Sequence, residues 1–306
     1  MSRQRRRPAR DVHGILLLDK PAGITSNEAL QRAKRLFQAR KAGHTGSLDR
    51  LASGLLPLCF GEATKFSSYL LDADKHYLAT CSLGTRTNTG DAAGEVLETR
   101  PVPDLSTERI EQVLERFRGD IEQVPPMFSA LKHQGKRLYE LAYEGKEVER
   151  RPRPVRIHRL DLLRFEGAQI DIDVICSKGT YIRTLGECIG EVLGCGAHIS
   201  ALRRVGAGPF SHPRMYRLEE LERLASDDPA GLDRVLLSID AVLDGMPAVT
   251  LSESVAYYLR QGQAVVVPHA PTAGVLRLYN DAQAFLGIGE VLDDGRVSPR
   301  RLVATQ

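Results

Sequence analysis

Apolar residues recur at intervals of three and four along several stretches of the chain, which is the spacing of one face of a helix. The clearest set is Ile110, Val113, Leu114 and Phe117, and Gly119 then ends the segment. By the same pattern we expect helices over about residues 27–38, 110–117, 136–144 and 182–193. Ser26 precedes the first of these helices and is its expected N-cap.

Other stretches alternate between apolar and polar residues, as a strand does when one of its faces is buried. The strands expected from this pattern cover residues 77–83 and 170–176, and strand-like patterns resume around 198–206. The apolar run within 13–19 predicts a buried strand. The segment 41–49 is punctuated by glycine, and we expect no regular element there. Helical and extended patterns thus follow one another along the chain, which predicts a mixed α+β fold.

The order of these patterns divides the 306 residues into three parts. Residues 1–11 carry arginines without apolar periodicity, so we expect a disordered basic tail. Residues 12–246 hold the mixed pattern and form the larger domain. Short strand patterns separated by turn residues then predict a small β-rich domain over 247–306; they lie at 264–267, 274–279 and 285–291.

The composition is that of an ordinary globular protein, with 42% hydrophobic and 26% charged residues. It excludes collagen, coiled coils and disordered chains. No apolar stretch reaches the roughly 18 residues that would span a membrane. The five cysteines form no CxxC pair, which argues against a disulfide framework and a zinc ribbon. We therefore expect a cytoplasmic protein in a reducing compartment.

The charge is distributed unevenly, although the net value is only +3. The arginines of the tail contribute +5, so the remainder of the chain is slightly acidic. Residues 32–50 and 132–164 each carry a local +5, while residues 219–244 carry −6. Such asymmetry would let one face meet a polyanion, although solvated helix faces and a disordered tail give the same counts.

Asp49 is the first candidate for chemistry, because it lies in a loop rich in Gly, Thr and Ser between apolar segments. Such a carboxylate can serve as a nucleophile or general base, but it can equally cap the following turn. When partly buried, it needs a cation to stay ionised. Arg183 is the best-placed cation for this purpose, because it lies in the first turn of an expected helix. The alternative is that Arg183 is an ordinary solvated arginine. Asp91 is a second candidate acid or a turn-stabilising residue.

Tyr77 lies on an expected strand directly after Lys75 and His76. An aromatic face beside cations suits stacking on an unpaired base, although a tyrosine on a strand is more often part of the core. His44 and His76 have no partners at the spacing of metal ligands, so we expect no metal site. The chain also has no Walker or Rossmann phosphate loop, and the sequence indicates no cofactor.

Six segments of the chain carry motifs that occur together in one order. The strongest is GHTGSLDRLASGLLP at 43–57, and the other five lie at 18–26, 75–77, 84–91, 124–132 and 176–183. Taken together, they resemble the TruB family of tRNA pseudouridine synthases, and the segment 43–57 closely resembles the signature of that family. The resemblance is strong over residues 13–210, and residues 285–302 look like the PUA-type RNA-binding module that ends these proteins.

This resemblance implies a pseudouridine synthase fold, with an active-site cleft across an extended antiparallel sheet and a PUA-like domain at the end. It implies isomerisation of uridine 55 in the TΨC loop of tRNA, with the base flipped into the cleft and no cofactor. Asp49 matches the catalytic aspartate, Tyr77 the aromatic residue that stacks on the base, and Arg183 the arginine that pairs with the aspartate. The further matches are Leu202 in the base pocket, His44 at the T loop, and Lys20 and Asp91 around the site.

One departure lies next to the expected catalytic residue, because Arg50 stands where the family usually has proline. The expected partner is the T-arm of tRNA, bound by a monomer that needs neither a guide RNA nor a membrane. Three alternatives stay open on the residues alone. They are an RNA-binding protein that only retains the fold, a nucleosidase that releases uracil, and a guide-dependent relative of the family.

Overall fold

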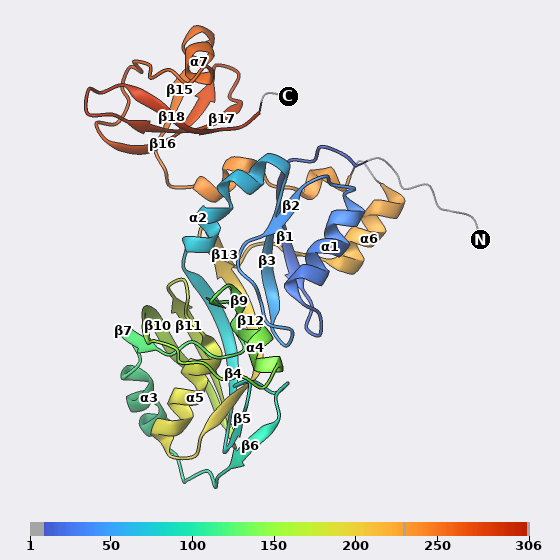
Figure 1. Cartoon of the computed structure of the whole chain (residues 1–306), viewed down its shortest axis with the longest axis vertical. Coiled ribbons are helices and arrows are strands. Elements are labelled where there is room, and N and C mark those ends of the chain that lie inside the picture. Colours follow the sequence, from blue (N-terminus) through green and yellow to red (C-terminus); the bar gives the residue numbers. More distant parts are fainter. Residues whose placement is uncertain (1–8, 229–230, 305–306) are drawn as a thin grey trace, which may run out of the picture.

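The computed structural model describes residues 9–228 and 231–304, and its centre is a ten-stranded sheet (Figure 1). The order across this sheet is β14 (Tyr216–Arg217), β1 (Gly14–Lys20), β3 (Ser53–Phe60), β12 (Ala197–Ala207), β4 (Lys75–Leu83), β11 (Gln169–Cys176), β10 (Arg153–Glu166) and β7 (Gly119–Gln123). Two short strands pair at its flanks, β2 (Ala42–His44) with β3 and β13 (Phe210–Ser211) with β12.

Most neighbours in the large sheet are antiparallel, as the family resemblance implies, but two pairs are parallel. One is β1 with β14, and the other is β12 with β3, where Arg203 lies opposite Ser53 and Arg204 opposite Gly54. Alternation within a strand does not reveal the direction of its neighbour, so the sequence could not predict this parallel junction. The loop that carries Asp49 enters β3 at this junction.

The two faces of the sheet pack against different layers, and β1 shows both. Leu16 and Leu18 join the larger core cluster with four helices, α1 (Ser26–Leu36), α3 (Thr107–Glu115), α5 (Ile182–Leu193) and α6 (Leu218–Asp227). Ile15 and Leu17 belong to a second cluster on the other face. There they meet the short helices η1 (Gly61–Phe66), α2 (Ser67–Asp72) and η3 (Ile239–Leu243). Alternate side chains of this one strand thus belong to two hydrophobic cores, one on each face of the sheet.

Three local expectations need correction. The N-cap of α1 is Thr25 rather than Ser26, because Thr25 and Glu28 form a reciprocal capping box. The segment expected to be irregular contains β2, which pairs with β3 from Ala42 to His44. Arg10 already pairs with Ala39 and Asp233, so the ordered chain begins before residue 11. Residues 1–8 of the expected tail lie outside the described residues.

The last part of the chain forms a four-stranded sheet of its own, in the order β15 (Ala248–Leu251), β16 (Gly274–Asn280), β17 (Phe285–Val291) and β18 (Val297–Leu302). Helix α7 (Glu253–Arg260) packs on it. The expected strand at 264–267 is a single bridge between Val265 and Val297. Contacts of this unit with the rest of the chain include the Phe285 ring, which lies 5.6 Å from that of Phe66, and the Tyr279 hydroxyl, which donates to Asp240 at 2.6 Å.

The remaining elements are short. Two hairpins leave the large sheet, β5 (Thr85–Thr87) with β6 (Val96–Thr99) and β8 (Lys132–His133) with β9 (Lys136–Arg137). The second hairpin leads into α4 (Leu138–Tyr143), within the helix expected at 136–144. A single 3-10 turn, η2 (Asp233–Val235), follows α6. Within the described ranges, no helix combines the length and apolar character needed to cross a membrane.

The parallel junction gives a first testable prediction at Gly54. This glycine has a φ of +97°, and a Cβ there would lie 2.2 Å from the carbonyl oxygen of Arg204. Because that atom belongs to the backbone, Gly54→Ala should lower the free energy of unfolding by about 3 kcal/mol. Urea unfolding measures the loss.

Gly167→Ala is the matched control, because Gly167 also has a positive φ (+59°) but faces open space. It should cost only about 1 kcal/mol. Equal losses in the two variants would contradict the proposed close contact between β3 and β12.

Candidate active site

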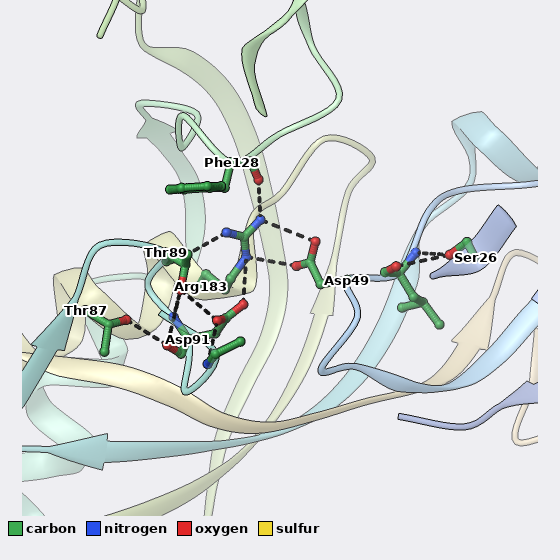
Figure 2. A network of polar contacts seen from close by, with 9 residues as sticks. Ser26, Asp49, Thr87, Thr89, Asp91, Phe128 and Arg183 are labelled. Carbon is green, nitrogen blue, oxygen red and sulfur yellow. Dashed lines mark hydrogen bonds and ion pairs between the residues drawn. The ribbon is translucent and has the colours of Figure 1, made fainter. Parts of the chain in front are cut away.

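The loop that carries Asp49 is held from both sides before it enters β3. The hydroxyl of Ser26 accepts from the Leu48 amide at 2.8 Å and donates to the Leu48 carbonyl at 3.1 Å (Figure 2). On the other side, the Ala52 amide donates to the Asp49 carbonyl at 3.1 Å. The Asp49 side chain itself is 43% exposed. The backbone is therefore fixed while the carboxylate stays accessible.

Arg183 reaches Asp49 from the second residue of α5. Gln123 fixes the start of this helix, because its side-chain oxygen accepts from the Tyr181 amide at 3.0 Å. The Arg183 side chain is only 5% exposed, and its Nε lies 2.8 Å from Oδ2 of Asp49. A second nitrogen donates to Oδ1 at 3.4 Å. The structure thus brings together two residues separated by 134 positions, as the resemblance implies.

The same guanidinium connects two further segments. It donates to the Thr89 carbonyl at 2.7 Å and to the Phe128 carbonyl at 2.8 Å (Figure 2). Asp91 lies 3.9 Å from Nε, and its carboxylate accepts from Thr89 Oγ1 at 2.7 Å. A buried guanidinium is tolerated only when its donors are satisfied. Arg183 meets this condition by joining three loops around Asp49.

Lys20 lies at the end of β1 and is fully buried. Its ammonium donates to the carbonyl of Ala52 at 2.7 Å and to that of Pro21 at 2.9 Å. Burial lowers the pKa of Lys20 to about 8, and the negative charge of Asp49 opposes this shift. Lys20 therefore secures the far end of the Asp49 loop and places a positive charge near its carboxylate.

Tyr77 and Leu202 lie on neighbouring strands that share a face. In the register of β4 and β12, Leu202 is opposite Ala79 and Arg204 is opposite Tyr77. Burial raises the pKa of Tyr77, although the positive charge of Arg204 lowers it in part. The negative charge of Asp49 adds a smaller increase. The phenol therefore lies in the field of that carboxylate and is neutral near pH 7. Leu202, only 8% exposed, adds an apolar wall on the same face.

His44 stands on β2, five residues before Asp49. It is half-buried, and its Nδ1 has no hydrogen-bond partner among the described residues. Burial lowers its pKa, and the charge of Arg204 lowers it further, so the ring is neutral near pH 7. No hydrogen bond or ion pair in the described ranges links His44 to Asp49 or Arg183, so the structure does not join it to that pair.

A hollow of about 880 Å³ adjoins this region. Leu202 contributes to its wall, together with Arg50 and Ala92, the residues that follow Asp49 and Asp91 in the chain. On β4 the hollow is lined by Leu78, Ala79 and Thr80. Its wall therefore includes Leu202 and its cross-strand partner Ala79 on the face of Tyr77, as well as residues of the opposite face.

Several residues of the site carry no sequence signal that could have assigned them. Arg204 is 1% exposed and donates to the carbonyls of Leu55 and Gly46 at 2.7 and 3.0 Å, so it ties β12 to β3 and to the Asp49 loop. Phe128 contributes only its backbone carbonyl, which any residue could supply. The sequence predicts Ser26 as a helix cap and gives no sign that it binds Leu48. Within residues 9–228 and 231–304, no group of three His, Cys, Asp or Glu side chains could hold a metal ion.

Solved structures identify the class of fold. One chain of a Cbf5-Nop10-Gar1 complex matches with a TM-score of 0.73 and 26% identity, over 95% of this chain and 84% of that one. A chain from an H/ACA RNP bound to a substrate RNA containing 2'-deoxyuridine gives a TM-score of 0.73 at 22% identity. The fold is therefore that of the pseudouridine synthases, with an added C-terminal β unit.

Sequence comparisons identify the family. Residues 34–182 match the TruB family pseudouridylate synthase N-terminal domain, residues 183–244 the tRNA pseudouridylate synthase B C-terminal domain, and residues 247–303 the pseudouridine synthase II TruB C-terminal domain. A protein of Nitrosococcus oceani named tRNA pseudouridine synthase B is 55% identical over all of this chain and 99% of its own length. Its namesake from Ectopseudomonas mendocina is 56% identical over 99% of each chain. The chain belongs to the TruB family.

The buried ammonium of Lys20 gives a prediction on the pH dependence of stability. Its pKa falls from 10.5 to about 8 on folding, so the folded protein is penalised most below pH 8, where the group is charged. Between these values the unfolded chain binds more protons than the folded one, and the penalty fades as pH rises. Relative to Lys20→Met, the wild-type protein should therefore gain stability with rising pH, by up to about 1.4 kcal/mol per pH unit.

Urea titrations of both proteins at pH values from about 7 to 10 measure this difference. A difference that stays constant over the range would contradict the assigned burial of the ammonium.

Proposed function

We propose that this protein isomerises uridine 55 in the TΨC loop of tRNA to pseudouridine. Membership of the TruB family and the full-length similarity to proteins named tRNA pseudouridine synthase B support the reaction and the substrate. The observation that carries the proposal is the half-exposed carboxylate of Asp49, paired at 2.8 Å with a guanidinium that is itself buried. This is the arrangement that an ionised catalytic carboxylate requires.

The reaction conserves the atoms of uridine. The N1–C1′ bond breaks, the uracil rotates, and C5 bonds to C1′ while the proton leaves C5 and N1 gains one. In the proposed mechanism, the Asp49 carboxylate either attacks the sugar or base covalently or removes a proton from the sugar on a glycal route. Both routes need an ionised and oriented carboxylate, which the two contacts from Arg183 provide. Neither route consumes a cofactor.

The target uridine has to leave its stack before it can meet Asp49, which costs a few kcal/mol. We assign Tyr77 to stacking on the extruded base and Leu202 to the apolar wall beside it, since both lie on one face of adjacent strands. Asp91 and Lys20 hold the loops around the site through Thr89 and Ala52. His44, neutral and with a free ring nitrogen among the described residues, is assigned to the T loop of the RNA.

The distribution of charge supports a polyanionic partner. The segments 32–50 and 132–164 each carry a charge of +5. The first contains Asp49, and the second follows Phe128, whose carbonyl accepts from Arg183. We propose that the cations of these segments bind phosphates of the T-arm, apart from Arg50, whose guanidinium contacts Gly23 and Glu28. We also propose that residues 12–246 form the catalytic domain and residues 247–306 a PUA-like RNA-binding domain. The proposed enzyme acts as a cytoplasmic monomer without a guide RNA, although the structures of similar fold come from ribonucleoprotein complexes.

Replacing the carboxylate tests this function. Asp49→Asn keeps the shape of the side chain and removes its charge, so the rate of pseudouridine formation should fall by about a thousandfold or more. The affinity for an unmodified tRNA transcript should change by less than about threefold, because phosphate contacts dominate binding. Mapping pseudouridine in the transcript and a filter-binding assay measure the two quantities.

Asp120→Asn is the control, since that aspartate is exposed, forms an ion pair with Arg156, and has no hydrogen bond or ion pair to Asp49 or Arg183 in the described ranges. Undiminished conversion by Asp49→Asn would contradict the role of Asp49. Binding by the wild-type protein without conversion would favour the RNA-binding alternative, release of free uracil would favour a nucleosidase, and a requirement for added RNA would favour the guide-dependent alternative.

A further inference from the structure

We propose that Arg50 is a positioning residue, which works with Glu28 to fasten the Asp49 loop to the first turn of α1. The inference rests on the proposed function, because its effect on rate is an effect on that reaction. It concerns a residue that, in the described part of the chain, has no hydrogen bond or ion pair to Arg183 and none to Tyr77.

Within the described residues, the hydrogen bonds and the ion pair of Arg50 go to the segment 23–28. Its carbonyl accepts from the Gly23 amide at 2.7 Å, and its guanidinium donates back to the Gly23 carbonyl at 3.3 Å. A second guanidinium nitrogen lies 3.5 Å from Oε2 of Glu28. Glu28 is fixed in turn, because the same oxygen accepts from the Thr25 amide at 2.6 Å in the capping box of α1. Arg50 therefore joins the loop to both a turn and a helix.

Asp49 lies between two residues that this segment holds. Leu48 is bound through its amide and its carbonyl by Ser26, and Arg50 is bound by Gly23 and Glu28. When both neighbours of a residue are fixed, its own backbone has little freedom left, and its side chain is presented in one direction. In this protein that direction leads to Arg183. Release of Arg50 would free one of the two neighbours.

The contacts of the Arg50 side chain favour a role within the protein. It borders the hollow that Leu202 also lines, and among the described residues its guanidinium contacts Gly23 and Glu28. Hydrogen bonds from Thr25, with a smaller contribution from Arg50, hold the pKa of Glu28 below its usual value, so this ion pair is charged at neutral pH.

The ion pair is exposed on both sides, with 61% of Arg50 and 50% of Glu28 accessible. Exposed pairs are weak, so loss of this one should slow the reaction without unfolding the protein. Arg50→Gln and Glu28→Gln should each lower the single-turnover rate about three- to tenfold, and the double variant should be no slower than Arg50→Gln. Glu28→Gln keeps an oxygen for the capping box, and Arg50→Lys should restore part of the rate.

Two measurements distinguish a positioning role of Arg50 from a role in RNA binding: the affinity for tRNA and the amide hydrogen exchange of the loop. The affinity of each variant for tRNA should stay within about twofold of wild type, since no phosphate contact is lost. In the free protein, amide hydrogen exchange over residues 21–28 and 45–53 should be faster in Arg50→Gln and Glu28→Gln. Arg214→Gln is the matched control, because Arg214 is 76% exposed and pairs with Glu220 at 3.6 Å, and no hydrogen bond or ion pair in the described ranges joins it to residues 20–53. This variant should leave rate and exchange unchanged.

Three results would overturn the inference. Weaker binding by Arg50→Gln with a shallower salt dependence, and no effect of Glu28→Gln, would make Arg50 a phosphate contact. Unchanged rate and exchange in both variants would mean that the ion pair does not position the loop. Additive losses in the double variant would show that the two residues act separately. If the wild-type protein forms no pseudouridine, the proposed function fails, while hydrogen exchange still tests the fastening.

Discussion

The geometry of the site depends on the buried guanidinium of Arg183 and its contact with Asp49. The two side chains lie 134 positions apart in the chain and meet at 2.8 Å. Loss of Asp49 would leave the buried Arg183 charge with less compensation, at a cost below the roughly 3–5 kcal/mol of a fully buried pair, because the Asp49 side chain is 43% exposed. Arg183 is further tied to the carbonyls of Thr89 and Phe128, so the loops around Asp49 converge on a single side chain.

The other buried cations follow the same principle. Lys20 and Arg204 are almost fully buried, and each donates to carbonyls of the segments that flank Asp49. Backbone carbonyls are rigid acceptors that carry no net charge, so they satisfy these cations without competing with the carboxylate for its partner. The result is a loop whose backbone is held by positive groups while one negative group stays half-exposed. Such preorganisation is what charge-dependent chemistry requires of a protein.

Much of this fold could be predicted from periodicity, whereas the pairing of its strands could not. Helices α1, α3 and α5 and strands β1, β4, β11 and β12 follow from apolar spacing. The parallel junction of β12 with β3 joins residues 150 positions apart, and no local pattern records it. Asp49 and Arg183 could be named together through family resemblance, but Ser26, Gln123 and the Phe128 carbonyl act through backbone contacts that exist only after folding.

The most direct test of the central claim is a crystal structure of Asp49→Asn bound to an unmodified T-arm RNA. The proposed role of the pair predicts that Arg183 still contacts residue 49 and that the target uridine lies against Tyr77. A reacting sugar or base atom should then lie about 3–3.5 Å from the side chain of residue 49. A target base that stays stacked in its loop, or an Arg183 turned away from residue 49 toward phosphate, would contradict it.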